Sequence, residues 1–296
     1  MKGSLPMNAA ITPDVLHYTA FATSPAGGNG AGVVLDATGL DDAAMTAIAA
    51  ELGYSESAFL TPGPDGATPS AAGRSFTLRF FSPKAEVDFC GHATVATAVA
   101  LGEQFGPGHF DLHTQAGLVP VDVREENGAL KATLTSVPPQ VSETDPADVA
   151  EALSALGWAD GELDAALPPR IAYAGVRHLV LASATRERLA RLDYDFDRLL
   201  ALMRRLDLTT VQLVWRESAT VFHVRDPFPV GGVVEDAATG AAAAAFGAYA
   251  RELGLVPPDA RLTLHQGHDM GRPSLLEVEL HPDDERIRVT GTAVRL

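Results

Sequence analysis

One stretch of the first half, VDFCGHATVATAVA at residues 87–100, places the only cysteine of the chain, Cys90, two residues before His92. A thiol beside an imidazole at the start of a helix is a common way to build a nucleophile or a proton-transfer base. Other groups that can transfer a proton are Asp88 in the same stretch, Glu56, in GYSESAFL, and the neighbouring acids Glu235 and Asp236, in EDAATG. These residue types predict proton-transfer or nucleophilic chemistry.

Each of these candidates also has a purely structural interpretation, and the sequence leaves both open. Glu56 follows a helix stop at Gly53 and could be a capping or solvated turn residue. Cys90 could be core packing, because free cysteine is among the most buried residue types. His92 could be a hydrogen-bonded histidine at a helix start, and Asp236 could cap the helix that follows it.

Two apolar helices would have to position these groups. The segment ATVATAVALGE at 93–103 is apolar nearly all round, which predicts a helix buried on every side. The segment EDAATGAAAAAFGAYARELG at 235–254 repeats this design in the second half. Helix N-termini carry unpaired N–H groups and about half a positive charge, so they attract carboxylates and oxyanions. If both helix starts faced one cleft, they would form an anion-binding pocket between the halves, whereas two ordinary capped ends would not.

The remaining elements follow from hydrophobic periodicity, and they predict two related domains, 7–138 and 139–284. The last strand, at 287–294, could return to either half, so 285–296 is a candidate addition to the first domain. A Pro- and Ser/Thr-containing link is expected at 134–146. Strands are predicted at 15–21, 32–35, 57–60, 76–81, 119–123, 177–182, 210–215, 220–224 and 262–266, and amphipathic helices at 41–52, 145–156 and 195–206.

Composition excludes several classes of protein. With 296 residues and 46% hydrophobic content, the chain can form two ordinary domains. Its 22 Lys and Arg against 38 Asp and Glu give a formal charge of −16, which repels nucleic acid and anionic membranes. No apolar run approaches the roughly 20 residues of a membrane span. A single cysteine allows no internal disulfide and fits a reducing cytoplasm.

Two further motifs are interpreted as turns. GGNGAG at 27–32 leads into an apolar β-type run, whereas a dinucleotide-binding loop leads into a helix, so no nucleotide cofactor is expected. HQGHD at 265–269 has two histidines three residues apart and no third partner nearby in the sequence, so it is interpreted as a solvated turn. No metal and no cofactor are predicted.

At these residues the sequence resembles the PhzF-like phenazine-biosynthesis family, which shares its fold with diaminopimelate epimerase and proline racemase. The order and spacing of the matching stretches carry the resemblance along the whole chain. They are FATSPAGGNGAGVVL near the start, SESAF at 55–59, CGHAT at 90–94, EDAATG at 235–240, QGHDMGRPS at 266–274 and the closing GTAV.

The resemblance implies an α/β fold of two pseudo-symmetric domains, each a β-barrel-like sheet wrapped around a central buried helix. It also implies an active site in the cleft, a homodimer, and an isomerase that moves a proton on a small carboxylated substrate without cofactor or metal. Carried over by motif, Glu56 would be the acid–base group, and His92 and Asp236 would hold and polarise the substrate. The substrate-binding positions implied by the same motifs are Gly91, Ala93, Thr239, Gly240 and Ala241.

The sequence departs from the family pattern in ways that bear on the mechanism. Ala241 stands where the phenazine enzyme has a serine, and Ser57 follows the catalytic glutamate where the family often has threonine. The related racemases use two thiols, and the position that matches the second thiol is about Ala237, so Cys90 is predicted to be a fold relic or a cleft wall.

Two alternatives stay open beside the isomerase. The first is an amino-acid racemase or epimerase that uses Glu56 and Cys90 as a mixed pair. The second is a non-catalytic protein that binds a small acid, which the missing serine at position 241 makes a real alternative.

Overall fold

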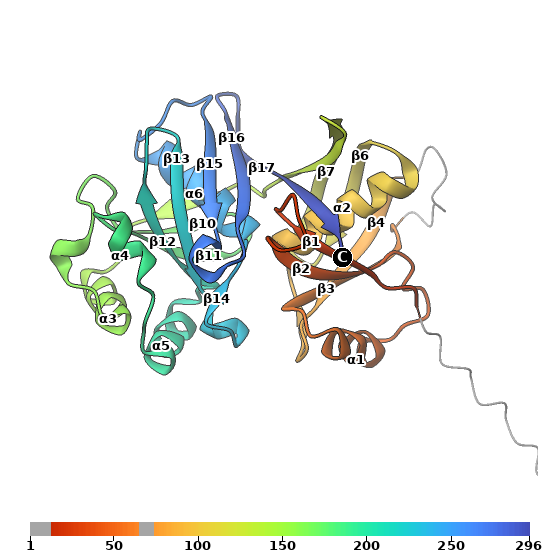
Figure 1. Cartoon of the computed structure of the whole chain (residues 1–296), viewed down its shortest axis with the longest axis horizontal. Coiled ribbons are helices and arrows are strands. Elements are labelled where there is room, and N and C mark those ends of the chain that lie inside the picture. Colours follow the sequence, from red (N-terminus) through yellow and green to blue (C-terminus); the bar gives the residue numbers. More distant parts are fainter. Residues whose placement is uncertain (1–12, 65–73) are drawn as a thin grey trace, which may run out of the picture.

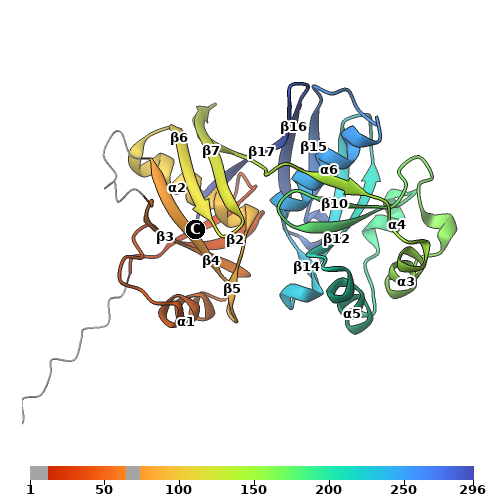
Figure 2. The same cartoon turned by 180° about the vertical axis from the view of Figure 1, so that it is seen from behind.

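The structure is a computed structural model that describes residues 13–64 and 74–296, so residues 7–12 of the first predicted domain lie outside the described residues. The described chain forms two lobes side by side, each with one helix enclosed by strands (Figure 1). Figure 2 shows the same arrangement from behind.

Eight strands close a barrel in the first lobe. Helix α2 (Gly91–Phe105) runs through it and is buried along its first twelve residues, as the all-round apolar pattern predicts. Helix α1 (Asp42–Leu52) packs outside, with Asp41 as its N-cap and Gly53 as its C-cap. The barrel strands in order of pairing are β1 (Leu16–Ala20), β2 (Asn29–Val34), β3 (Glu56–Pro62), β4 (Ser75–Phe81), β6 (Gly108–Thr114), β7 (Gly117–Glu126), β8 (Ala129–Thr135) and β17 (Asp284–Arg295), which pairs back with β1, while the short β5 (Glu86–Val87) precedes α2.

The second lobe repeats this plan around helix α6 (Gly240–Glu252), which is buried from its first residue to Ala250. Helices α3 (Pro146–Leu156), α4 (Arg186–Ala190) and α5 (Phe196–Leu206) lie outside it. Its strands in order of pairing are β9 (Gln140–Ser142), β10 (Arg170–Tyr173), β11 (Arg177–Ala182), β12 (Thr210–Arg216), β13 (Val221–Pro227), β15 (Arg261–Gln266), β16 (Ser274–His281) and β17, with the short β14 (Glu235–Asp236) before α6 and 3-10 turns η1 (Asp160–Glu162), η2 (Pro229–Gly231) and η3 (His268–Met270).

Parallel pairings reveal the internal symmetry of the two lobes. Strands β2 and β3 are parallel with α1 between them in the chain, as β11 and β12 are with α4 and α5 between them. Strands β4 and β6 are parallel with α2 between them, as β13 and β15 are with α6. A parallel pair needs a long crossover, and each lobe supplies one outer and one central crossover. The predicted class, two pseudo-symmetric α/β lobes each built around a buried helix, is confirmed.

Strand β17 belongs to both lobes. Its residue Val289 pairs with Val278 of β16 on one side and with Leu134 of β8 on the other, and Val294 pairs with Thr19 of β1. The segment predicted as a link at 134–146 is also partly sheet, because β8 ends at Thr135 and β9 pairs with β10. The division between residues 138 and 139 stays a prediction.

The cores explain why both central helices are rich in small residues. One continuous apolar cluster includes residues of both α2 and α6, where alanines let the surrounding strands approach closely. A second cluster lies between α3, α5 and the outer face of β11 and β12, and a third lies under α1. Within residues 13–64 and 74–296, no helix has the length and apolar character that a membrane crossing requires.

Candidate active site

The two central helices start at the same place in the molecule. A Cβ atom added to Gly91, the first residue of α2, would lie 3.0 Å from the Cα of Gly240, the first residue of α6. The N-cap residues Cys90 and Thr239 make no side-chain capping hydrogen bond. Two uncapped helix N-termini therefore meet between the lobes, and both contribute positive potential there. Of the two arrangements that the sequence left open, the facing helix starts are found.

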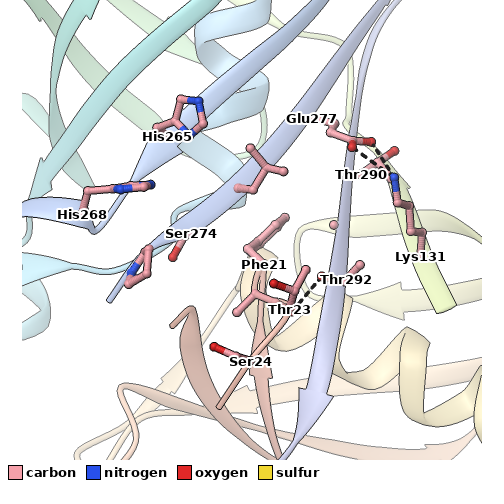
Figure 3. A pocket seen from close by; sticks show the side chains of 14 residues that line it. Phe21, Thr23, Ser24, Lys131, His265, His268, Ser274, Glu277, Thr290 and Thr292 are labelled. Atoms are coloured by element: carbon pink, nitrogen blue, oxygen red, sulfur yellow. Dashed lines mark hydrogen bonds and ion pairs between the residues drawn. The ribbon is translucent and has the colours of Figure 1, made fainter. Parts of the chain in front are cut away.

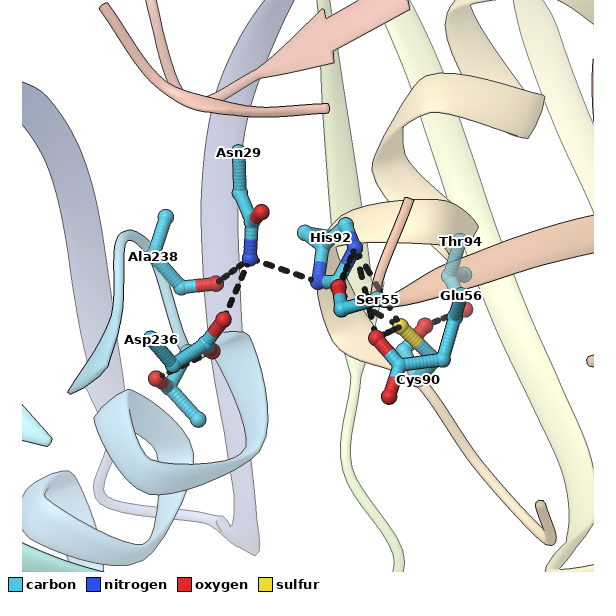
Figure 4. A network of polar contacts seen from close by, with 9 residues as sticks. Asn29, Ser55, Glu56, Cys90, His92, Thr94, Asp236 and Ala238 are labelled. Carbon is cyan, nitrogen blue, oxygen red and sulfur yellow. Dashed lines mark hydrogen bonds and ion pairs between the residues drawn. The ribbon is translucent and has the colours of Figure 1, made fainter. Parts of the chain in front are cut away.

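Three side chains gather beside the start of α2 (Figure 4). Glu56, the first residue of β3, places Oε2 at 3.6 Å from Nε2 of His92 and at 3.7 Å from Sγ of Cys90. All three residues are buried, with Glu56 only 8% exposed. The strand start and the helix start thus bring together three of the four proton-transfer candidates of the first half, while Asp88 lines the cavity that Glu56 also lines.

Asn29 joins this group to the second lobe. Its amide nitrogen Nδ2 lies 3.1 Å from Nδ1 of His92 and 2.6 Å from Oδ1 of Asp236. Because an amide nitrogen only donates, Nδ1 of His92 accepts, and a neutral imidazole then carries its proton on Nε2. The Nε2–H group consequently faces the Glu56 carboxylate.

Asp236 is held on both of its carboxylate oxygens. Oδ1 accepts from Asn29, and Oδ2 accepts from the hydroxyl of Thr239 at 2.7 Å. The amide of Gln266 fixes the same loop, because Nε2 donates to the Asp236 carbonyl and Oε1 accepts from the Thr239 N–H. The interpretation of Asp236 as a helix cap is wrong, since Thr239 is the N-cap of α6 and the carboxylate is bound by side chains.

Glu235 points to a different part of the molecule. Its carboxylate forms a two-pronged ion pair with Arg225, whose Nε lies 2.9 Å from Oε1, and both side chains are less than a tenth exposed. Arg225 also donates to the carbonyl of Ala190. The two adjacent acids therefore have different partners: Glu235 is in an ion pair with Arg225, and Asp236 is in the network of Asn29 and Thr239.

Burial shifts the pKa of two groups at the site. It raises the pKa of the Cys90 thiol well above its usual range, and the nearby Glu56 charge adds to the effect. A protonated thiol is a poor nucleophile and a poor base. Burial also raises the pKa of Asp236, and the nearby Glu56 charge acts in the same direction.

Glu56 forms part of the wall of a cavity of about 550 Å³ between the lobes. Tyr173 and Phe228 from the second lobe and Phe89 from the first give this cavity aromatic walls, and the cationic groups of Lys84 and Arg177 line it too. A flat or cyclic acid matches these surroundings, because apolar walls with a few charged groups are typical of small-molecule sites.

A second cavity, of about 380 Å³, lies elsewhere between the lobes and contains none of the predicted catalytic residues (Figure 3). Lys131 and Glu277 form an ion pair on one wall, and His265 and His268 stand on the other. Burial, with further contributions from neighbouring histidine charges, lowers the pKa of both histidines.

Glu56, Cys90 and His92 are also a possible metal-binding group by residue type, since their donor atoms lie within 4.8 Å of one another. The hydrogen bonds do not fit this role. Asn29 donates to Nδ1 of His92, so Nε2, the nitrogen that faces the other two donors, carries a proton.

The predicted substrate-binding residues Gly91, Ala93, Thr239, Gly240 and Ala241 are all buried at the two helix starts. Two residues of the network, Asn29 and Gln266, were not among the predicted site residues, although GGNGAG and QGHDMGRPS contain them. Asn29 lies between two glycines and Gln266 precedes one, and a polar amide beside glycine in these motifs is the sequence signal that could have identified them. As the N-cap of α6, Thr239 rather than Ala237 is the internal counterpart of Cys90.

Comparison with known proteins agrees with this architecture. The family described as "Phenazine biosynthesis-like protein" matches residues 18–296. An uncharacterized isomerase of Mesorhizobium japonicum is 35% identical over 96% of this chain and 97% of its own length. The trans-2,3-dihydro-3-hydroxyanthranilate isomerase of Pseudomonas fluorescens is 31% identical over 93% of this chain and 94% of its own.

Among solved structures, one described as a "Predicted Epimerase" from Pseudomonas aeruginosa is 30% identical, with a TM-score of 0.83 over 96% of this chain and 97% of that one. The predicted isomerase class is confirmed by the names of these relatives. With a family match that runs from β1 to the end of the chain, the protein belongs to the PhzC-PhzF family of phenazine biosynthesis-like proteins.

Proposed function

We propose that the protein isomerises a small carboxylated substrate by moving one proton between two of its carbon atoms, with Glu56 as the acid–base group. The observation that carries this proposal is the position of Glu56, which lines the cavity between the lobes while its Oε2 faces Nε2 of His92. The Pseudomonas fluorescens relative is named for an isomerisation of a cyclic acid. That substrate is of the class that the aromatic-walled cavity suits.

Each part of the site has a task in this mechanism. The Glu56 carboxylate takes a proton from one substrate carbon and returns it to another on the same face. The Nε2–H of His92 and the carboxyl of Asp236 hold and polarise the substrate. Asn29 fixes the relative position of these two groups, because it hydrogen-bonds to both. General acid–base catalysis contributes roughly 10²–10⁴-fold. The meeting helix starts, at Gly91 and Gly240, stabilise negative charge as it develops on the substrate.

The position of Cys90 favours one carboxylate over a racemase pair. Two-base racemisation needs one group on each face of the substrate carbon, but Sγ of Cys90 lies 3.7 Å from Oε2 of Glu56, on the same side. The counterpart across the internal symmetry is Thr239, which has no thiol. A homodimer and a cytoplasmic location stay predictions from the sequence.

Deuterium exchange tests the proposal across a panel of candidate substrates. Cyclic and acyclic carboxylic acids are incubated with the protein in heavy water, and incorporation at carbon is followed by NMR and mass spectrometry. Glu56→Gln keeps the shape of the side chain but removes its transferable proton, so we expect exchange to stop while ligand binding survives. Glu51→Gln, an exposed change on α1, is the matched control and should exchange normally.

Two results would contradict the proposal. Exchange at the wild-type rate in Glu56→Gln would show that another group carries the proton, and the neighbouring His92 would be the next residue to substitute. Binding of an acid by the wild type without any exchange would instead identify a non-catalytic small-acid binding protein.

A further inference from the structure

Three histidines meet on the face of the second-lobe sheet that points away from α6, at a distance from Glu56. His223 on β13 and His265 on β15 are direct neighbours in the parallel register, so their side chains leave the sheet on the same face. His268 follows in the turn η3, after Gly267 reverses the chain in the left-handed conformation with φ 73°. The strand pairing thus supplies the third histidine that the local sequence HQGHD lacks.

The three rings are close neighbours. Ring centres lie 5.0 Å apart for His223 and His265, 5.3 Å for His265 and His268, and 6.3 Å for His223 and His268. Three imidazoles bound tetrahedrally at the usual zinc–nitrogen distance of about 2.0–2.1 Å have ring centres about 5 Å apart. Two of the three ring spacings match this value. Among the described residues only Glu56, Cys90 and His92 have three donor atoms within 4.8 Å of one another, so the histidine nitrogens converge on one ion only after side-chain rotation, which the exposed His268 allows.

A carboxylate already orients one of these rings. Nε2 of His223 lies 2.5 Å from Oε2 of Glu217, so this nitrogen donates its hydrogen and leaves the lone pair of Nδ1 for a ligand. Metal-binding histidines commonly donate their second N–H group to a carboxylate in this way. In the described part of the chain, no hydrogen bond engages a ring nitrogen of His265 or His268.

We infer that His223, His265 and His268 form a binding site for a zinc-class divalent cation. Three imidazole donors suit zinc, nickel and copper ions, whereas magnesium and calcium prefer oxygen ligands. His265 and His268 also line the second cavity, so a fourth coordination position on that side would be open to water or a small anion (Figure 3). The formal charge of −16 favours the approach of a cation.

Titration of the chelator-treated full chain tests this site. Zn²⁺ binding is measured by calorimetry, and binding of Co²⁺, whose open d shell quenches indole emission, by tryptophan fluorescence. Trp215 is a built-in reporter, because its ring centre lies 5.3 Å from that of His223. We expect one high-affinity ion per chain, quenching of Trp215, and no competition from Mg²⁺.

Single substitutions locate the ion. His265→Gln and His268→Gln should each weaken Zn²⁺ binding by more than about 100-fold, since loss of an outer-shell partner alone costs 10–100-fold. Glu217→Gln should weaken it by about 10–100-fold. Two controls should bind as the wild type does, namely His281→Gln, an exposed histidine, and Glu51→Gln, which removes the same charge elsewhere.

The measurement separates this site from the Glu56 group. Titration of Cys90→Ser should give the same affinity, because the histidine site contains no sulfur. If His265→Gln binds Zn²⁺ as tightly as the wild type, or if Co²⁺ leaves Trp215 emission unchanged at saturation, the inference is wrong. Loss of binding in Cys90→Ser would also overturn it, by placing the ion at Glu56, Cys90 and His92.

Discussion

The backbones of Gly91 and Gly240 are in direct contact at the point where the two central helices start. A Cβ atom on Gly91 would come within 3.0 Å of the Gly240 Cα, and a Cβ atom on Gly240 within 3.3 Å of the Gly91 Cα. The neighbour in each case is backbone, which cannot move aside as a flexible side chain can. This contact sets the distance between the two helix N-termini, and therefore the positions of the backbone N–H groups that would meet the proposed substrate.

Gly91→Ala should destabilise the protein by about 1–3 kcal/mol, the usual cost of overpacking in a well-packed interior. It should also lower the affinity for carboxylic acids, because the helix starts have to separate. Urea unfolding and ligand titration measure the two effects. Gly161→Ala is the control, since nothing lies within 4 Å of a Cβ there. Equal stability of the two variants would show that the helix starts are not held in contact.

Cys90→Ser should keep most of the exchange activity, with a loss of less than about 10-fold, because the thiol is protonated and therefore idle. Burial raises its pKa well above the usual range, and the Glu56 charge acts in the same direction. The serine hydroxyl can replace the weak hydrogen bond to Glu56. The rate of deuterium incorporation is measured in a buffer with a chelator. A loss approaching the roughly 10⁴-fold expected for an essential group would refute the one-carboxylate mechanism.

Asp236→Asn and Glu235→Gln should damage different properties. Asp236 accepts hydrogen bonds from both Asn29 and Thr239. In Asp236→Asn the new NH₂ group would face one of these two donors and could not accept from it. The rate of exchange should therefore fall, while the protein still folds. Glu235→Gln leaves the buried Arg225 without its counter-charge and should reduce stability by up to about 3–5 kcal/mol. Exchange rates and urea unfolding separate the two. A larger loss of exchange in Glu235→Gln than in Asp236→Asn would show that Asp236 does not contact the substrate.

Asp226→Asn should make the protein less sensitive to alkaline pH. Burial raises the pKa of Asp226 well above its usual range, and its Oδ2 atom has no hydrogen-bond partner among the described residues. The unfolded chain, with a pKa near the usual ~3.9, loses this proton first as pH rises. The free energy of unfolding of the wild type therefore falls with pH from about pH 4 up to the folded-state pKa, by at most about 1.4 kcal/mol per pH unit.

Urea unfolding at pH 5 and pH 8 checks this difference. The stability lost between the two pH values should be smaller in Asp226→Asn than in the wild type, whereas Asp259→Asn, an exposed acid, should behave as the wild type does. An identical loss in all three proteins would mean that Asp226 stays ionised in the folded state.

Local patterns determined the longer helices and many strands of this protein, but not the short helix α4 or the strands β6, β8 and β16. The Asp41 cap and the Gly53 stop bound α1, and the all-round apolar segment after Cys90 is buried as α2, because capping and periodicity act over a few residues. The strand β9, inside the predicted link, was not predicted, because its three residues exist as a strand only through pairing with β10. Short strands carry too little local signal to be found without their partners.

The candidate site divides in the same way. Residue types and motifs determined Glu56, His92 and Asp236 as candidates, whereas only the closed sheets bring Asn29 next to Asp236, 207 residues away along the chain. Gln266 likewise acquires its role from the approach of β15 to the start of α6. Sequence alone could not decide these contacts, because the relative position of distant side chains depends on strand register and barrel closure, which many residues set together.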